Sequence, residues 1–163
     1  MKTFPLSSEL REYFAHMSAK ALSELAFVTA RPLGGGFVQP PDWAPLGARL
    51  RFGGALRGAL EIWVPERIAA ALTDNIFGPA LDATPEDNTR ADSHCDALME
   101  TLSRICGALL GAVAEGERPY HLGTPGRCRR PMPAPPGGEE IEAWLEVEGD
   151  PVLVRMGLAP GSS

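Results

Sequence analysis

Apolar residues recur at steps of three and four in two long segments of the chain, which predicts two amphipathic helices. The first starts at Ser7 or Ser8, either of which can cap it, and runs to about Leu25. The second runs from Ala91 to Glu115 and is the longest segment that keeps this period. Five apolar residues share one face of the second helix: Leu98, Leu102, Ile105, Leu109 and Val113. This face is expected to pack on a hydrophobic core.

Alternating apolar and polar residues predict two antiparallel hairpins. The first joins residues 46–52 to residues 57–64, and the second joins residues 140–147 to residues 151–158. The second hairpin is expected to turn at residues 149–150, because Gly and Asp favour tight turns. In its first strand one face is apolar and the other is mainly acidic, which is typical of a half-buried strand.

Proline and glycine mark the remaining connections. Residues 31–45 hold four prolines and three consecutive glycines, so we expect a loop there, and residues 124–138 form a second Pro/Gly-rich loop. A third helix is expected from Pro65 to about Gly78. Residues 80–90 are polar and interrupted by proline, which predicts a surface connection, and residues 119–122 suit a short strand.

The order of these elements predicts the fold class. A long helix, a Pro/Gly-rich loop and a hairpin follow one another twice, which indicates a weak internal duplication. Helices and hairpins without regular βαβ alternation favour an α+β fold in which long helices cover a mainly antiparallel sheet. With 163 residues the chain is long enough for one core, so a single domain over residues 1–163 is expected.

A second face of the longer predicted helix is polar. Four residues recur on it at steps of four and three: Asp96, Glu100, Ser103 and Gly107. A carboxylate, a hydroxyl and a stretch of bare backbone therefore line up on one side. Ser93 and Asp96 also have the spacing of a capping pair, so we favour helix initiation as the role of Asp96 and look for chemistry at the other positions.

The segment DALMETLSRICGALLG, residues 96–111, resembles the signature helix of the CheC/CheX/FliY chemotaxis phosphatases. In that family a Glu is followed three residues later by an Asn, then by an apolar pair, a Gly and small residues. Glu100 takes the place of the family Glu and Gly107 that of its Gly, whereas Ser103 stands where the family has Asn. The resemblance is closest to the single-site CheX branch, and the layout of the whole chain agrees with it.

The resemblance implies a role in chemotaxis or two-component signalling. In the family the substrate is a response-regulator receiver domain with an acyl phosphate on an Asp; the Glu pairs with a receiver Lys, and the Asn orients a water for in-line attack. Glu100 and Ser103 would be the catalytic pair of such a phosphatase, acting on a CheY-like receiver. Asp96, Arg104 and Gly107 would belong to the receiver-docking face. Mg2+ would belong to the receiver, so no cofactor is expected on this chain.

Serine at position 103 leaves two alternatives open. Its hydroxyl donates and accepts hydrogen bonds, but the side chain is shorter than Asn and lacks the fixed two-point geometry of an amide. Misplacing a reacting water costs on the order of a hundredfold in rate per ångström. The chain is therefore either a weak phosphatase or a catalytically silent binding module on the same scaffold. Arg104 points about 100° around the helix from Ser103 and is expected to be solvated.

Charge and hydropathy narrow the classes of function. Fifteen Lys and Arg against 21 Asp and Glu give a formal net charge of −6, which provides no general attraction for nucleic acid or anionic lipid. Arg127, Arg129 and Arg130 form a local arginine cluster that could meet an acidic partner, although a solvated loop is the commoner role of such a cluster. No apolar run could span a bilayer and no leader pattern begins the chain, so a cytoplasmic protein is expected.

The cysteines and histidines do not suggest a reactive site. Cys95, Cys106 and Cys128 are an odd number without CxxC spacing, which disfavours a disulfide framework or a structural zinc site. Ser93, His94 and Cys95 are adjacent on the predicted helix and diverge by about 100° per residue. Neither a metal site nor a nucleophile–base pair is expected among them.

A non-catalytic alternative also stays open. The chain would then be a structural interaction module that dimerises through a hairpin edge, with the acidic face of the last hairpin meeting other components. Trp144 stands on that face and could contact a partner, a neighbouring strand or a dimer mate. The resemblance implies a homodimer as well, so self-association alone would not separate the two hypotheses.

Overall fold

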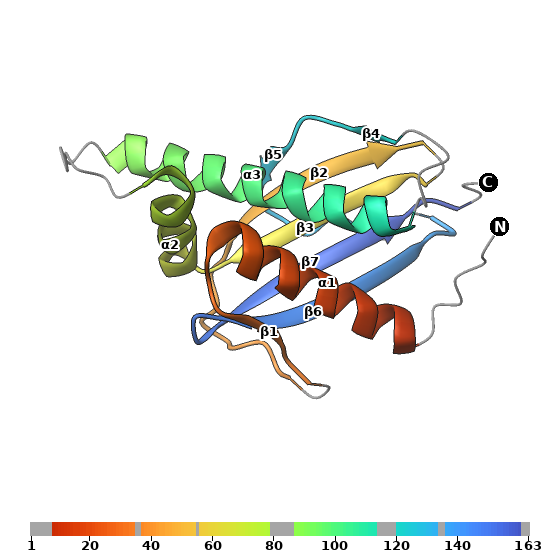
Figure 1. The fold of residues 1–163 in the computed structure, drawn as a ribbon, viewed down its shortest axis with the longest axis horizontal. Coiled ribbons are helices and arrows are strands. Elements are labelled where there is room, and N and C mark those ends of the chain that lie inside the picture. Colours follow the sequence, from red (N-terminus) through yellow and green to blue (C-terminus); the bar gives the residue numbers. More distant parts are fainter. Residues whose placement is uncertain are drawn as a thin grey trace.

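The computed structural model describes residues 8–34, 37–54, 56–78, 87–113, 120–133 and 136–160 (Figure 1). The helices of this part are α1 (Ser8–Ala26), α2 (Glu66–Phe77) and α3 (Asp87–Val113). Its strands are β1 (Ala30–Pro32), β2 (Leu46–Gly53), β3 (Gly58–Val64), β4 (His121–Leu122), β5 (Gly126–Cys128), β6 (Glu139–Val147) and β7 (Asp150–Leu158). The strands form one antiparallel sheet, and α1 and α3 lie side by side across one of its faces (Figure 1). The predicted α+β fold is confirmed.

The two halves of the chain exchange elements across the sheet. The strand order is β1-β6-β7-β3-β2-β4, and β5 also pairs with β2. Strand β1 and helix α1 of the first half therefore lie on the second hairpin, whereas β5 and α3 of the second half lie on the first hairpin. This reciprocal arrangement is the spatial form of the duplication that the order of elements predicted.

Both predicted hairpins are present. β2 pairs with β3, β6 pairs with β7, and the two hairpins join through β3 and β7 in the middle of the sheet. The second turn lies one residue earlier than predicted, at Glu148 and Gly149, whose φ angles are 49° and 86°. Two successive residues with positive φ are characteristic of a tight hairpin turn that matches the strand twist, so Asp150 already belongs to β7.

Two short strands lie inside the segments predicted to be loops. β1 pairs with β6 at the edge of the sheet, where the missing N–H of Pro32 is tolerated, and β5 pairs with β2. Three residues are too few to show an alternating pattern. The expected strand at residues 119–122 is confirmed as the shorter β4.

Helix α3 begins at Asp87, four residues before its predicted start at Ala91. Residues 87–90 are polar but contain no proline or glycine, so nothing in them stops the helix from extending toward its N-terminus. Asp96 consequently lies in the third turn, and its assignment to helix initiation is wrong. The helix ends at Val113, and the last two residues of the predicted helix, 114–115, lie outside the described residues.

The hydrophobic core lies between the sheet and the helices. Its fully buried side chains come from α1, α3, α2 and the helix-facing positions of the central strands. The largest include Phe14, Leu22, Leu50, Leu60, Ile62, Ile68, Leu72, Leu98, Leu102, Ile105, Ile141 and Leu145. The apolar stripe predicted for the longer helix is thus the face of α3 that packs on the sheet.

Part of the second face of the sheet, around Trp144, is covered by the chain itself. Phe37 and Trp43, from the first Pro/Gly-rich loop, contact Trp144 with ring centroids 4.9 and 4.8 Å away. The Trp43 indole N–H donates to the Pro151 carbonyl at 3.3 Å. Of the three roles left open for Trp144, packing within the chain is the one observed.

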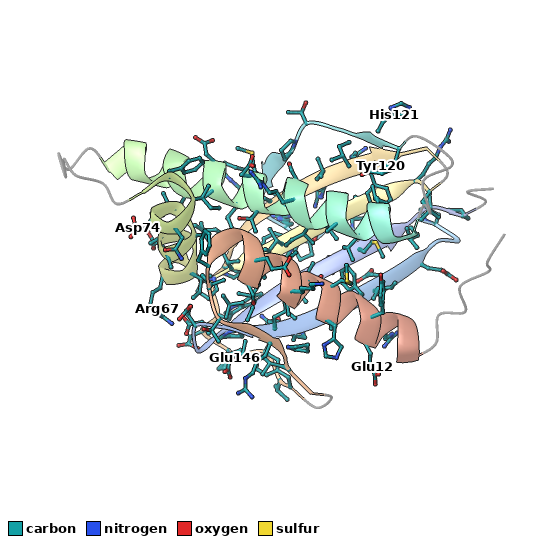
Figure 2. The ribbon with its side chains drawn as sticks, in the orientation of Figure 1. Glu12, Arg67, Asp74, Tyr120, His121 and Glu146 are labelled. Atoms are coloured by element: carbon teal, nitrogen blue, oxygen red, sulfur yellow. The ribbon has the colours of Figure 1, made fainter. Side chains whose placement is uncertain are left out.

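The glutamates on the acidic face of the last hairpin are paired within the chain. Glu140 and Glu142 both accept hydrogen bonds from Arg155, and Glu146 accepts one from Arg31. Arg67 of α2 lies at the end of the sheet where β6 turns into β7 (Figure 2). Its Nε atom donates to Asp150 Oδ2 at 2.7 Å. These three glutamates are therefore ion-paired within the chain, and Glu142 nevertheless stays 49% exposed.

Candidate functional site

The polar face of α3 points away from the sheet. Asp96 and Arg104 are exposed, while Glu100, Ser103 and Gly107 are partly exposed. On the opposite side of the same helix, Leu98, Leu102 and Ile105 are 0% exposed. The helix therefore fixes the apolar stripe in the core and presents the predicted docking face to the outside, with all five predicted residues on it.

Glu100 and Arg104 form an ion pair along this face. The Arg104 Nε atom donates to Glu100 Oε1 at 2.8 Å, one helical turn along. The two side chains stay accessible, with 44% of Glu100 and 56% of Arg104 exposed. Arg104 is solvated as expected, and it also forms an ion pair that the spacing of four residues between a Glu and an Arg indicates.

Ser103 makes a hydrogen bond within its own helix. Its hydroxyl donates to the Met99 carbonyl at 3.0 Å, which is a common way for a helical serine to use its proton. The lone pairs of the oxygen remain able to accept a hydrogen bond from a water or a partner. Ser103 therefore offers an acceptor on the docking face, but not the paired donor and acceptor of an amide.

Gly107 is not required by the packing of the chain. A Cβ atom added there would meet no heavy atom within 4 Å beyond its neighbours and its own helix backbone. A glycine inside a helix costs about 0.5–1 kcal/mol relative to alanine. The backbone at Gly107 is therefore open on its outer side, as far as the described residues go.

A second charged centre, which the sequence did not predict, lies on the opposite face of the sheet at Glu61. This carboxylate is 1% exposed although it faces away from the helices. Glu61 Oε1 accepts from Arg49 Nε at 3.0 Å, Arg49 Nη2 at 2.9 Å and the Met132 backbone N–H at 2.7 Å. Oε2 accepts from Trp63 Nε1 at 3.0 Å and Arg155 Nη1 at 3.1 Å. We call Glu61, Arg49, Trp63, Arg155 and the Met132 backbone the Glu61 network.

Part of this network was open to prediction. Arg49 lies directly opposite Glu61 in the register of the first hairpin, and that hairpin was predicted. Arg155 and Met132 come from segments far along the chain, which sequence spacing cannot bring together. A small hollow beside the network is lined by Pro133, Glu140, Gly157 and Arg155. The Arg155 guanidinium is already paired with carboxylates of the chain.

Hydrogen bonding and burial shift the pKa values of several ionisable groups in the chain. Hydrogen bonding from Arg155 holds the pKa of Glu140 below its usual range. Burial raises the pKa of the Cys106 thiol to about 12 and that of the Cys128 thiol to about 11. No disulfide joins the three cysteines, and thiols with such pKa values are poor nucleophiles near neutral pH.

Neither a metal centre nor a membrane span is evident in the described ranges. Within them, no group of three or more His, Cys, Asp or Glu side chains is arranged to hold a metal ion. No helix in this part of the chain is long and apolar enough to cross a bilayer.

Comparison with known proteins gives a fold relationship. No protein-family model matches the sequence, and no curated protein sequence matches it. Solved structures do match. CheX from Desulfovibrio desulfuricans is 18% identical, covers 92% of this chain and 99% of its own, and superposes with a TM-score of 0.66. CheX from Vibrio vulnificus is 14% identical, covers 96% of this chain and 99% of its own, and gives 0.68.

A third match is a structure of a CheX–CheY–BeF3–Mg2+ complex from Borrelia burgdorferi. It is 10% identical, covers 95% of this chain and 99% of the matched chain, and has a TM-score of 0.69. These likenesses extend over nearly the whole length of both chains, and they agree with the signature residues of α3. The chain therefore has the CheX-like fold of the CheX and CheC-like chemotaxis proteins.

Proposed function

We propose that the chain binds the phosphorylated receiver domain of a CheY-like response regulator through the exposed face of α3. The observation that carries the proposal is that Glu100 and Ser103 stand one helical turn apart on the solvent side of this helix, with neither covered by the sheet. The fold agrees, because one structure with this fold is a complex of CheX with CheY.

The charges of this face suit such a partner. Glu100 would exchange Arg104 for a cation of the receiver, and the resemblance implies that this cation is a lysine. Exposed ion pairs along a helix contribute only about 0.3–0.5 kcal/mol, so the exchange costs little. Gly107 would let the receiver approach the helix backbone beside the pair, since no described residue occupies that space.

Catalysis is the finer part of the proposal. Phosphoryl transfer to water depends mainly on positioning and charge stabilisation, which an amide at this place would provide with two fixed groups. The Ser103 hydroxyl already donates to the Met99 carbonyl, so it has only an acceptor left for the water. We infer that the wild-type chain binds the receiver and hydrolyses its aspartyl phosphate weakly or not at all.

The experiment is a dephosphorylation assay with a phosphorylated CheY-like receiver. Ser103→Asn should accelerate loss of the phosphoryl group by about tenfold or more over the wild-type chain, because it restores a two-point contact to the water. Ser103→Ala is the matched control and should not accelerate it. If Ser103→Asn is no faster than Ser103→Ala while the receiver still binds, the catalytic part of the proposal is wrong and the binding part stands.

The alternative of a dimerising module has a specific edge to consider. Residues 139–143 of β6 pair with β7 on one side, but β1 covers only the Leu145–Val147 end of the other side, so the outer edge of residues 139–143 has no strand partner within the described segments. Charged side chains on an edge oppose strand pairing, and this stretch carries Glu139, Glu140 and Glu142. Pairing of two copies through this edge is therefore less well supported than docking on α3.

A further inference from the structure

The arginine cluster, Arg127, Arg129 and Arg130, has no role in the site described so far. All three residues are exposed. Among the ion pairs of the described residues, none uses any of their side chains. Three unpaired cations within four residues, in a chain with a net charge of −6, form a local patch of positive charge.

The fold brings this cluster next to the docking helix. β5 contacts α3 and passes beside the middle of that helix (Figure 1). Arg127 lies directly opposite Ala48 of β2, and Ala48 is buried under the helices. Since directly paired residues of antiparallel strands project to the same face, Arg127 leaves the sheet on the side of α3. Arg127 therefore lies beside α3, on the side of the sheet that this helix covers, and Arg129 and Arg130 follow it in the chain.

The backbone that carries the cluster is fastened to the far side of the sheet. The Arg130 carbonyl accepts from Arg49 Nη2 at 3.0 Å, and the Met132 N–H donates to the buried Glu61 carboxylate at 2.7 Å. The Met132 carbonyl also accepts from Arg155 Nη1 at 3.3 Å. A segment of this composition would otherwise be a solvated loop. The Glu61 network instead holds it against the sheet edge beside α3, which lowers the entropy that docking would remove.

We propose that the arginine cluster is a second contact surface for the receiver, facing the acidic rim of its phosphorylation site. This inference rests on the proposed function. A receiver surface that holds Mg2+ must present carboxylate oxygens, because Mg2+ is bound through such hard ligands. Such a rim would be repelled by most of this acidic chain and attracted by the arginine cluster. The cluster orients the receiver on α3 and raises the rate of association.

The test measures association of the wild-type chain with a CheY-like receiver activated by BeF3− and Mg2+, at about 50 mM and about 500 mM salt. Arg127→Glu should slow association by about threefold at low salt, and reversal of all three arginines should slow it by about tenfold. At high salt these differences should largely disappear. Arg11→Glu is the matched control, because it makes the same charge change on α1, over the other half of the sheet, and it should leave the rate within about twofold.

The possible results separate the role of the arginine cluster from the alternatives. Equal rates for Arg127→Glu and Arg11→Glu would overturn the inference, as would a tenfold loss that persists at high salt. If all arginine variants bind like the wild type while Glu100→Arg does not bind, the receiver docks on α3 without the cluster. If the cluster serves a nucleic acid, reversal of the arginines will abolish binding to a DNA duplex and leave receiver binding intact, which overturns the inference. If the wild type binds no receiver, the proposed function fails first.

Discussion

Glu61 and Glu100 are both glutamates paired with arginine, and they differ in almost every other respect. Glu61 accepts five hydrogen bonds in a site that is closed to solvent. Glu100 has one ion pair, along its own helix, and 44% of its side chain is exposed. The first arrangement leaves no acceptor for another molecule, whereas the second leaves most of the carboxylate accessible. A structural carboxylate and a binding carboxylate are thus distinguished by their unused hydrogen-bonding capacity.

The largest expected effect follows from the buried member of this comparison. Glu61→Gln would turn an amide NH2 group toward donors from Arg49, Trp63 or Arg155 and leave buried guanidinium charge without its partner. We expect the free energy of unfolding to fall by about 3–5 kcal/mol, measured by chemical denaturation.

Glu142→Gln is the control for this change, because Glu142 contacts the same Arg155 at 3.0 Å but is 49% exposed. It should cost less than about 1 kcal/mol. Equal losses for the two variants would show that burial does not separate the two kinds of carboxylate.

A buried and an exposed serine repeat the contrast on a smaller scale. Within the described residues, the Ser18 hydroxyl is buried and has no hydrogen-bond partner, whereas Ser103 is partly exposed and donates to Met99. Ser18→Ala removes an unsatisfied buried hydroxyl and improves helix propensity. It should therefore raise the free energy of unfolding by about 1 kcal/mol, measured by chemical denaturation. Thr101→Val is the control, because the Thr101 hydroxyl donates to the Ala97 carbonyl at 2.8 Å, and this variant should not stabilise the fold.

The smallest expected effect is a dependence of stability on pH. Arg155 lowers the pKa of Glu140 in the folded chain, so the ionised form stabilises the fold above the pKa of the unfolded chain, about 4.3, and the contribution is lost as pH falls below it. Wild-type stability should therefore decline below about pH 4 more steeply than that of Glu140→Gln, by less than about 1 kcal/mol. Denaturation series at several pH values would measure this, and identical slopes would contradict it.

Periodicity predicted the elements that are long enough to show it. The hairpins and the apolar face of α3 have repeated spacings, so their existence and facing were accessible from the sequence. β1 and β5 have three residues each, and their pairing depends on partners far along the chain. The start of α3 was placed too late because residues 87–90 are polar, although no residue among them breaks a helix.

In the site, too, local spacing predicts what lies on one helix, and contacts between distant segments cannot be predicted from it. The spacing of Glu100 and Ser103 predicted a shared and accessible helix face, since helical geometry alone decides it. The four-residue step from Glu100 to Arg104 indicates an ion pair just as directly, and the structure contains it. The Arg49–Glu61 pair follows from the first hairpin, but the rest of the Glu61 network could not be predicted, because Arg155 of β7 and the Met132 backbone after β5 are brought to Glu61 only by the folded sheet.

Calorimetric titration with a CheY-like receiver tests the central proposal most directly. Mg2+ is present throughout, BeF3− is added or left out, and the wild-type chain is compared with Glu100→Arg and with the exposed control Glu12→Arg on α1. The account predicts tighter binding of the BeF3−-activated receiver, a loss of at least about tenfold in affinity for Glu100→Arg, and wild-type affinity for Glu12→Arg. Wild-type affinity in the Glu100→Arg variant, or no binding of the activated receiver by the wild-type chain, would contradict it.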